Sequence, residues 1–262
     1  MSLDARLDAR FRKTTLWSVL AGWATRDVVS VRGHHFLVRG LGPNAVVLDL
    51  GAHKGEFSNA LAAIGCRCVA VEADPELSGS IASSERLTVI SGAIDVESGP
   101  RTFFAHENPE AGSLHANAES ATRIAQIRAF TLADAFHEAN IDRANLVKID
   151  IEGTEVAMLN SLSKEILERC DQITVEFHDF YSTHISTADV ERVIERLEAC
   201  GFYAMSFSRG YTDVLFIRRD AGLLRGWEVS YVTNVLRYCL GFARRLARLR
   251  IPGRQSFNSG AL

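Results

Sequence analysis

The stretch VVLDLGAHKGEFS, residues 46–58, decides the fold class of this 262-residue chain. Its first half is a β-rich apolar run of the kind that forms a buried strand. The glycines at positions 51 and 55 follow, and they allow a tight turn with positive φ and a close approach of the backbone to a ligand. A helix is expected next, from about Glu56 to Ile64. A strand, a glycine-rich turn and a helix in this order predict an α/β protein with a binding site at the carboxyl end of the strand.

The same alternation of β-rich runs and helical segments continues along the chain, which predicts a seven-stranded, mostly parallel sheet with helices on both faces. The strands are expected at residues 45–50, 66–73, 87–94, 145–151, 172–178, 202–208 and 212–217. The helices are expected at residues 56–64, 75–84, 132–139, 155–168 and 187–200. The last helix has Thr187 as its expected N-cap and Gly201 just past its end. The short turn Arg209-Gly210-Tyr211 predicts that the final two strands form a C-terminal antiparallel hairpin.

Changes in this pattern predict the domain boundaries. Residues 1–44 are expected to form a helical lead-in, amphipathic over residues 1–25, with a short strand near residues 35–38. Residues 45–220 form the main domain. Within it, the polar stretch 95–128 is a variable insertion, either β-rich or a mobile loop, with RTFFAHE as one arm of an antiparallel hairpin.

The C-terminal tail, residues 221–262, differs from the rest of the chain in charge. It holds seven arginines and one acid, a balance of +6, whereas the whole chain carries −3. Aromatic residues and leucines alternate with these arginines, which predicts a basic amphipathic helix followed by a disordered end. Over residues 221–250 such a helix suits peripheral contact with an anionic membrane surface. The alternatives are a helix that covers the sheet and a helix that forms the surface of a homodimer.

Composition and charge exclude several other classes of protein. A net charge of −3 argues against a dedicated nucleic-acid binder, which usually carries a basic excess. The N-terminal MSLDARLDARFRK lacks the apolar core of a signal peptide, and no stretch approaches the roughly 18 apolar residues that span a bilayer. The five cysteines are irregularly spaced, which is typical of buried thiols in a reducing compartment. We therefore expect a cytoplasmic protein, at most peripheral to the inner face of the membrane.

Two acids at strand ends indicate the kind of ligand. Asp49 comes directly before the glycine turn, where its charge suits a ligand with a positive amino group and would repel a pyrophosphate. The dinucleotide pattern GxGxxG and the GKS/T of a P-loop are both missing from this turn. Glu72 ends the next strand, 21 positions after Gly51, where an acid can accept hydrogen bonds from a ribose diol.

Acidic side chains also gather at the ends of the fourth and fifth strands. KIDIEGTE, residues 148–155, carries Asp150 and Glu152, which strand alternation places on the same side. Glu176 and His178 share a face of the fifth strand by the same period of two. If the two strands are neighbours in the sheet, Asp150, Glu176 and His178 converge at one edge.

Two chemical roles are open for this convergence. Either His178 is a general base that deprotonates an acceptor hydroxyl, or it binds a divalent cation together with Asp150 and Glu176, and the cation lowers the pKa of the hydroxyl. Glu155 fits the start of a helix, where the dipole favours negative charge. Most of the histidines outside this edge and outside the glycine turn, a group that includes His34, are expected at the surface or in loops.

Taken in order, DLGAHKGEFS, VEADP, SGAI, TLADAF, LVKIDIEGTE and ITVEFH resemble the FkbM-type S-adenosylmethionine-dependent methyltransferases. The resemblance spans residues 45–217, and KIDIEGTE is its most specific part. It implies a class I, Rossmann-like methyltransferase fold and transfer of a methyl group, typically to a hydroxyl of a sugar, a glycan or a secondary metabolite. His53 stands where related proteins more often carry Asn. The basic tail is not part of the shared pattern and inherits no role.

The resemblance also implies roles for individual residues. The residues implied to bind the cofactor are Asp49, Gly51, Ala52, His53, Gly55, Phe57, Glu72, Ala73, Gly92, Ala93, Ile94 and Asp150. The residues of the glycine turn would line the methionine part of S-adenosylmethionine, and Glu72 would hold its ribose. The residues at positions 73 and 92–94 would border its adenine. Asp150, Glu176 and His178 would face the acceptor and carry catalysis.

Two other classes of function stay open. The first is a catalytically inactive methyltransferase-like scaffold that acts through its basic tail at a membrane or a partner, against which the intact acids at positions 49, 72, 150 and 176 count. The second is a nicotinamide oxidoreductase, against which Asp49 and the missing GxGxxG count. The expected partner is therefore a small-molecule or glycan hydroxyl acceptor and not a nucleic acid.

Overall fold

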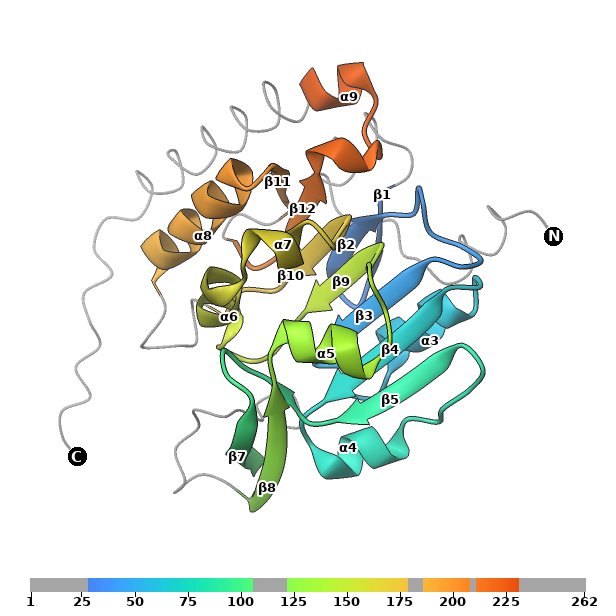
Figure 1. Ribbon diagram of the computed structural model, residues 1–262, viewed down its shortest axis with the longest axis vertical. Helices are drawn as coiled ribbons and strands as arrows, with labels where there is room; N and C mark the ends of the chain where they lie inside the picture. The colour runs from blue at the N-terminus through green and yellow to red at the C-terminus, as the bar shows by residue number, and fades with distance from the viewer. Residues whose placement is uncertain (1–27, 106–121, 179–185, 208–210, 231–262) are drawn as a thin grey trace, which may run out of the picture.

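The part of the chain with a described structure leaves out both ends and three short internal stretches. The computed structural model describes residues 28–105, 122–178, 186–207 and 211–230 (Figure 1). The helix expected over residues 1–25, the centre of the insertion at 106–121 and the tail beyond residue 230 lie outside the described residues.

Seven strands form one sheet, at the positions expected from the sequence. They are β3 (Val46–Leu50), β4 (Arg67–Glu72), β5 (Leu87–Ser91), β9 (Leu146–Ile149), β10 (Gln172–Val175), β11 (Phe202–Ser206) and β12 (Val214–Arg218). Their order across the sheet is β11-β12-β10-β9-β3-β4-β5 (Figure 1). The first five are parallel, and β12 runs antiparallel to both β10 and β11. The predicted fold class, an α/β Rossmann-like protein with a seven-stranded, mostly parallel sheet, is confirmed.

The order in which the chain adds strands to the sheet reverses between β3 and β9, although the two strands are parallel. β4 and β5 lie on one side of β3, whereas β9 and β10 lie on the other. Ligands of open α/β sheets bind outside the carboxyl ends of the strands at such a switch point. The strands around it carry Asp49, Glu72, Asp150 and Glu176 at or next to their carboxyl ends. The sheet order therefore brings these four acids, which are far apart in sequence, to one edge.

Helices follow the strands, with two differences from the sequence expectation. They are α3 (Glu56–Ala62), α4 (Pro75–Ser80), α5 (Leu132–Glu138), α6 (Glu155–Ser161), α7 (Lys164–Leu167) and α8 (Thr187–Ala199). The helix expected over residues 155–168 is interrupted, because the Ser163 hydroxyl caps a new helix. The N-cap of α8 is Ser186 and not Thr187, because Ser186 and Asp189 bond each other's backbone N–H groups in a capping box.

Two apolar cores cover opposite faces of the sheet. One packs α5, α6 and α8 against the sheet, and it includes Leu48 and Leu50 of β3. The other packs α3 against the opposite face and includes Val47, which precedes Leu48 and therefore points to the other side of β3. Because both faces are buried, the central strands are largely apolar, with a few buried polar residues such as Lys148 of β9 and Gln172 of β10.

A two-stranded sheet precedes the main sheet. β1 (Val28–Val31) pairs antiparallel with β2 (His34–Leu37), and this hairpin packs in the second core against β10 and β12. Only a short strand near residues 35–38 is expected from the sequence, so the described part of the lead-in is β-structure and not helix. The side-chain amide of Gln172 joins the hairpin to the sheet: it accepts a hydrogen bond from Leu37 N at 2.9 Å and donates one to Leu37 O at 3.0 Å.

The insertion after β5 forms a small sheet of its own. β6 (Ala93–Ile94), β8 (Arg123–Phe130) and β7 (Gly99–Ala105) are neighbours in that order, with β7 antiparallel to β8. The arm RTFFAHE lies in β7 as far as residue 105, and its expected antiparallel pairing is confirmed.

The described chain ends in the turn η3 (Arg219–Ala221) and the short helix α9 (Gly226–Ser230). Glu228 of α9 is 1 % exposed and accepts two hydrogen bonds from the guanidinium group of Arg39. This ion pair joins α9 to the segment that follows β2. Each helix within the described ranges is too short or too polar to cross a membrane.

Candidate functional site

The glycine turn after β3 packs directly against the end of β9. Gly51 has φ 76°, and a Cβ at this position would lie 1.7 Å from the carbonyl oxygen of Asp150. The N–H groups of Gly51 and Ala52 both donate to the carbonyl oxygen of Val71, which ties the turn to β4. Gly55 also has positive φ, 72°. Only glycine fits at position 51, so the fold itself requires the residue that the sequence singled out.

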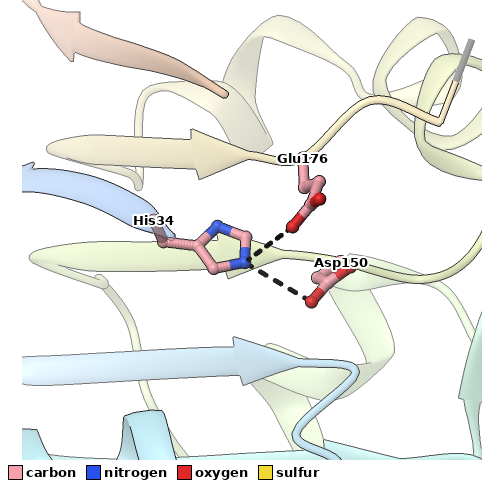
Figure 2. A group of neighbouring side chains, drawn as sticks. All are labelled: His34, Asp150 and Glu176. Atoms are coloured by element: carbon pink, nitrogen blue, oxygen red, sulfur yellow. Dashed lines mark hydrogen bonds and ion pairs between the residues drawn. The ribbon is translucent and has the colours of Figure 1, made fainter. Parts of the chain in front are cut away.

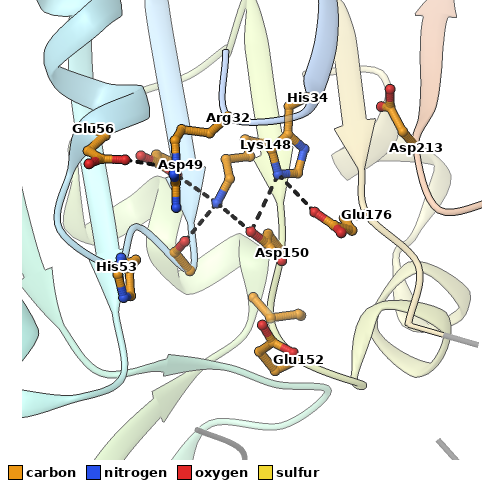
Figure 3. Close-up of polar contacts among 12 residues, drawn as sticks. Arg32, His34, Asp49, His53, Glu56, Lys148, Asp150, Glu152, Glu176 and Asp213 are labelled. Atoms are coloured by element: carbon orange, nitrogen blue, oxygen red, sulfur yellow. Dashed lines mark hydrogen bonds and ion pairs between the residues drawn. The ribbon is translucent and has the colours of Figure 1, made fainter. Parts of the chain in front are cut away.

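Lys148 joins the two acids on either side of the switch point (Figure 3). Its Nζ lies 3.2 Å from Asp49 Oδ1 and 3.2 Å from Asp150 Oδ2, and it donates a hydrogen bond to Gly51 O at 2.7 Å. Burial disfavours the charged amine, but the two carboxylates outweigh it and raise the pKa of Lys148.

One oxygen of Asp49 is hydrogen-bonded within the chain, whereas its Oδ1 has Lys148 as an ion-pair partner but no hydrogen bond among the described residues. Asp49 Oδ2 accepts hydrogen bonds from Ser58 N at 3.1 Å and Ser58 Oγ at 2.7 Å, and the residue is 0 % exposed. Lys148 is thus a cation of the chain itself beside Asp49, and the acid helps to fix the shape of the glycine turn. The expected contact between Asp49 and the amino group of a ligand stays a prediction.

Glu72 closes the turn from the side of β4. Its carboxylate accepts hydrogen bonds from His53 N at 2.6 Å and from Asp74 N at 2.8 Å. Burial raises the pKa of Glu72 to about 7, although the two backbone donors and Lys148 act in the opposite direction. Glu72 thus lies beside the glycine turn, where a ribose-binding acid is required.

Ala52, within the glycine turn, and Phe57, in the first turn of α3, are both buried. Phe57 is 2 % exposed, and its ring meets the rings of His34 and Phe36 edge-on, with centroids 6.0 and 5.6 Å apart. Ala52 belongs to the same core. These two side chains therefore pack within the chain, and their implied contacts with the cofactor stay a prediction. His53 is half-buried and has φ 51°, a conformation that few residues other than glycine adopt.

The residues implied to border the adenine are covered by the chain itself. A Cβ at Gly92 would lie 2.4 Å from the ring of Phe130, so this glycine serves the packing of β8. Ala93 and Ile94 form β6 and are 5 % and 2 % exposed, each inside an apolar core. Ala73 is half-buried against the core of the insertion. Of these four, only Ala73 keeps appreciable exposed surface for a ligand.

The β1–β2 hairpin brings a histidine to the acids at the switch point. His34 is 1 % exposed, and its Nε2 lies 3.4 Å from Asp150 Oδ2 and 3.8 Å from Glu176 Oε2 (Figure 2). Its Nδ1 has no hydrogen-bond partner among the described residues. The expectation that His34 lies at the surface or in a loop is therefore wrong, because β2 buries it. It was missed because it stands 116 positions before Asp150 and no short spacing connects them.

His178 faces the other carboxylate oxygen of Asp150. Its Nε2 lies 3.4 Å from Glu152 Oε2 and 3.8 Å from Asp150 Oδ1, and its Nδ1 is hydrogen-bonded to Glu155 Oε1 at 3.0 Å. Glu155 is 0 % exposed and also accepts hydrogen bonds from two backbone N–H groups of the loop after β9. Glu155 therefore positions an imidazole as well as beginning α6.

The expected convergence of Asp150, Glu176 and His178 is thus divided into two groups that share Asp150. His34 and Glu176 belong to one group, and Glu152 and His178 to the other; in each group the candidate ligand atoms lie within 4.8 Å of one another. Burial would raise the pKa of Asp150, but the neighbouring lysine and the two histidines bring it well below its usual range. Asp150 is therefore a carboxylate at neutral pH.

The protonation of His178 bears on its role as a base. Burial lowers its pKa, but the hydrogen bond to Glu155 and the charges of Glu155, Glu152 and Asp150 raise it to about 9. An imidazole that is protonated at neutral pH cannot accept a proton, so the general-base function considered for His178 is disfavoured. Glu176 is a better acceptor, because burial and the charge of Asp150 raise its pKa.

A glycine turn, acids at a switch point and a seven-stranded Rossmann-like sheet together define a class of nucleotide-dependent enzymes. The sequence pattern of the methyltransferase FkbM domain matches residues 49–203, which is more than half of the chain. The chain belongs to the FkbM family of methyltransferases, and the predicted family is confirmed.

Solved structures with a similar arrangement are known at low sequence identity. Methyltransferase FkbM from Methylobacillus flagellatus KT is 16% identical, with a TM-score of 0.43. That match covers 66% of this chain and 43% of the other, so this chain spans less than half the length of that protein. Magnesium protoporphyrin IX methyltransferase from Synechocystis PCC 6803, solved with bound S-adenosylmethionine, is 13% identical, with a TM-score of 0.39 and 77% of each chain covered. No curated protein matches this chain in sequence.

Proposed function

We propose that the chain transfers the methyl group of S-adenosylmethionine to a hydroxyl group of a small molecule or a glycan. One observation carries this proposal: the glycine turn after β3 is in direct contact with the acidic carboxyl end of β9, the neighbouring strand in the sheet. Gly51 packs on the carbonyl of Asp150, and Lys148 binds both. A cofactor held by the turn would therefore present its reactive end to the side chains of Asp150 and Glu176.

The residues beside the turn suit the cofactor. A carboxylate offers about four acceptor sites, and the His53 and Asp74 backbones use two of those of Glu72. The remaining sites can accept hydrogen bonds from a ribose diol. Asp49, Ser58 and Lys148 hold the turn in shape from below, and the methionine end would lie against the backbone of Gly51 and Ala52.

The acidic edge suits the acceptor. When bound, S-adenosylmethionine supplies a methyl group that moves to the acceptor oxygen as the carbon–sulfur bond breaks and leaves its electron pair on sulfur. Glu176 receives the proton of the hydroxyl, because its raised pKa makes it a competent acceptor and its side chain is 36 % exposed. Asp150 stays charged and orients the hydroxyl. Orientation of this kind can contribute roughly 7–11 kcal/mol to a lower barrier.

The cofactor part is tested by titration calorimetry with S-adenosylmethionine on the full chain. We expect wild-type binding and, for Glu72→Gln, an affinity lower by about 10- to 100-fold, since the amide keeps one acceptor oxygen and loses the charge. Glu85→Gln, an exposed glutamate between α4 and β5, serves as the matched control and should bind as the wild type does. Undetectable binding by the wild type, or equal binding by Glu72→Gln, would overturn the proposal.

The acceptor part is tested with methyl-labelled S-adenosylmethionine and fractionated small-molecule and glycan extracts. A methylated hydroxyl is an ether, so the transferred label should survive mild alkali. Label that alkali releases would mean a carboxyl acceptor and would contradict transfer to a hydroxyl.

A further inference from the structure

The group formed by Asp150, Glu152 and His178 has the spacing of a metal site. His178 Nε2 lies 3.4 Å from Glu152 Oε2 and 3.8 Å from Asp150 Oδ1. N–H···O hydrogen bonds are about 2.7–3.2 Å long, so these three groups are too far apart to bond one another well. Ligands placed about 2.0–2.2 Å from one ion are roughly 3–3.6 Å apart, which is close to the observed spacing.

His178 is held as metal-bound histidines are held. The residue is 9 % exposed, its Nδ1 is engaged by the buried carboxylate of Glu155, and its Nε2 points at Glu152 and Asp150. Histidine ligands almost always bond a carboxylate, a carbonyl or water through the second ring nitrogen, which fixes the tautomer and turns the other lone pair toward the metal. Glu155 is itself fixed by backbone donors at 3.0 to 3.2 Å.

The two groups around Asp150 are not equivalent. On the side of His34 and Glu176, the Asp150 Oδ2 atom already has the ammonium group of Lys148 at 3.2 Å, which supplies a positive charge there. On the side of His178, Oδ1 faces an imidazole and a second carboxylate. A cation is therefore better accommodated on the His178 side.

We propose that Asp150, Glu152 and His178 bind one divalent cation, with Glu155 as the residue that orients His178. The cation takes the place of the Nε2 proton, which His178 releases to solvent on binding, and lies among the same three carboxylates. One imidazole and two carboxylates suit Mn²⁺, Fe²⁺ or Zn²⁺. The side chains of Asp150 and Glu152 are 25 % and 32 % exposed, which leaves room for water or an acceptor hydroxyl on the ion. A hydroxyl bound to such an ion has a lowered pKa. This last role rests on the proposed methyl transfer, whereas the binding of the cation does not.

Cation binding is tested with Mn²⁺ on the full chain after removal of metals with a chelator. Loss of the free Mn²⁺ signal in electron paramagnetic resonance should show one ion per chain, displaced by Zn²⁺. We expect Glu152→Gln and His178→Gln each to weaken binding at least tenfold, and Glu155→Gln to weaken it by about 10- to 100-fold through the orientation of His178. Glu85→Gln should bind Mn²⁺ as the wild type does.

Two further readouts keep the test decisive. Pulsed measurements on wild-type protein with Mn²⁺ should show coupling to a histidine nitrogen, which needs no variant to fold; its absence would remove His178 as a ligand. Loss of binding in His34→Gln but not in His178→Gln would assign the ion to the other group and overturn the proposal. If the wild type binds S-adenosylmethionine but neither Mn²⁺ nor Zn²⁺, the proposed cation site is refuted and the proposed methyl transfer is not. If it binds Mn²⁺ but not S-adenosylmethionine, only the proposed methyl transfer is refuted.

Discussion

Lys148 is a buried charge held between two buried or half-buried carboxylates, those of Asp49 and Asp150. Removing one partner of a buried ion pair leaves an uncompensated charge, which typically costs about 3–5 kcal/mol. We expect Lys148→Met to lower the free energy of unfolding by about this amount, measured by urea denaturation. Adding Asp49→Asn should restore part of the loss, because the amide is neutral and can still accept hydrogen bonds from Ser58.

The matched control for this prediction is Lys164→Met. Lys164 pairs with Glu168 on the surface at 3.6 Å, and exposed pairs contribute at most about 1 kcal/mol. If Lys148→Met were no more destabilising than Lys164→Met, the ion pair at the switch point would be unimportant for stability.

Glu72 should make stability depend on pH. Burial and the charge of Asp74 outweigh Lys148 and the backbone donors, and they raise the pKa of Glu72 from its usual 4.5 to about 7 in the folded chain. The folded state therefore binds the proton more tightly, and the free energy of unfolding falls as pH rises from about 4.5 to about 7, by on the order of 2–3 kcal/mol. Urea denaturation at pH 5 and pH 8 should show this fall in the wild type and less of it in Glu72→Gln. An equal fall in both would show that other groups cause it.

At the scale of residues, the sequence identified the acids at the switch point and not their partners. Asp150, Glu176 and His178 follow apolar strands, and the alternation of a strand indicates which of them share a side. His34 and Lys148 carry no such signal, since a histidine in an apolar strand and a lysine before an acid are ordinary residues. Only the packing of β2 against the sheet brings His34 to Asp150.

At the scale of elements, the side chain of Gln172 is one of the polar groups that attach the β1–β2 hairpin to the main sheet, and it bonds the backbone of Leu37. Gln172 bonds both the N–H and the carbonyl of Leu37, and both residues are buried. Each buried backbone group left without a partner costs about 1–3 kcal/mol. We expect Gln172→Leu to destabilise the chain by about 2–4 kcal/mol and to increase hydrogen exchange at the Leu37 amide.

The control for this prediction is Gln126→Leu. Gln126 also makes a side-chain hydrogen bond, to Thr102 at 3.0 Å, but at the surface of the insertion. Gln126→Leu should change the free energy of unfolding by no more than about 0.5 kcal/mol and should leave hydrogen exchange at the Leu37 amide unchanged. Unchanged exchange at Leu37 in Gln172→Leu would mean that the core alone holds the hairpin.

The strands of the main sheet could be predicted because each is a buried apolar run bounded by turn residues. The hairpin could have been found from its turn. Arg32 and Gly33 separate two β-rich runs and have φ of 52° and 91°, the two positive values of a type I′ turn. Helix ends were harder to place, because Ser186 and Thr187 are both good capping residues and only the capping box with Asp189 selects Ser186.

At the scale of the whole molecule, one buried ion pair joins the beginning and the end of the described chain. Glu228 of α9 accepts hydrogen bonds from Arg39 at 2.8 and 3.1 Å and from Arg225 N at 2.6 Å. Hydrogen bonds to charged groups contribute about 1.5–3 kcal/mol. We expect Glu228→Gln to lower the free energy of unfolding by about this amount in urea. Glu138→Gln, which alters an exposed pair with Arg128, should lower it by less than about 1 kcal/mol.

The contact between Gly51 and the carbonyl of Asp150 also limits how this chain can change. A Cβ at position 51 would lie 1.7 Å from that oxygen, so there is no room for a side chain between the turn and the backbone of residue 150. Libraries that aim at a new acceptor should therefore vary the side chains of Glu152 and Glu176 and leave the backbone of residues 149–151 in place. We expect this fold to acquire new acceptors by exchange of side chains around the contact between Gly51 and residues 149–151. Insertions at that contact should abolish binding of the cofactor.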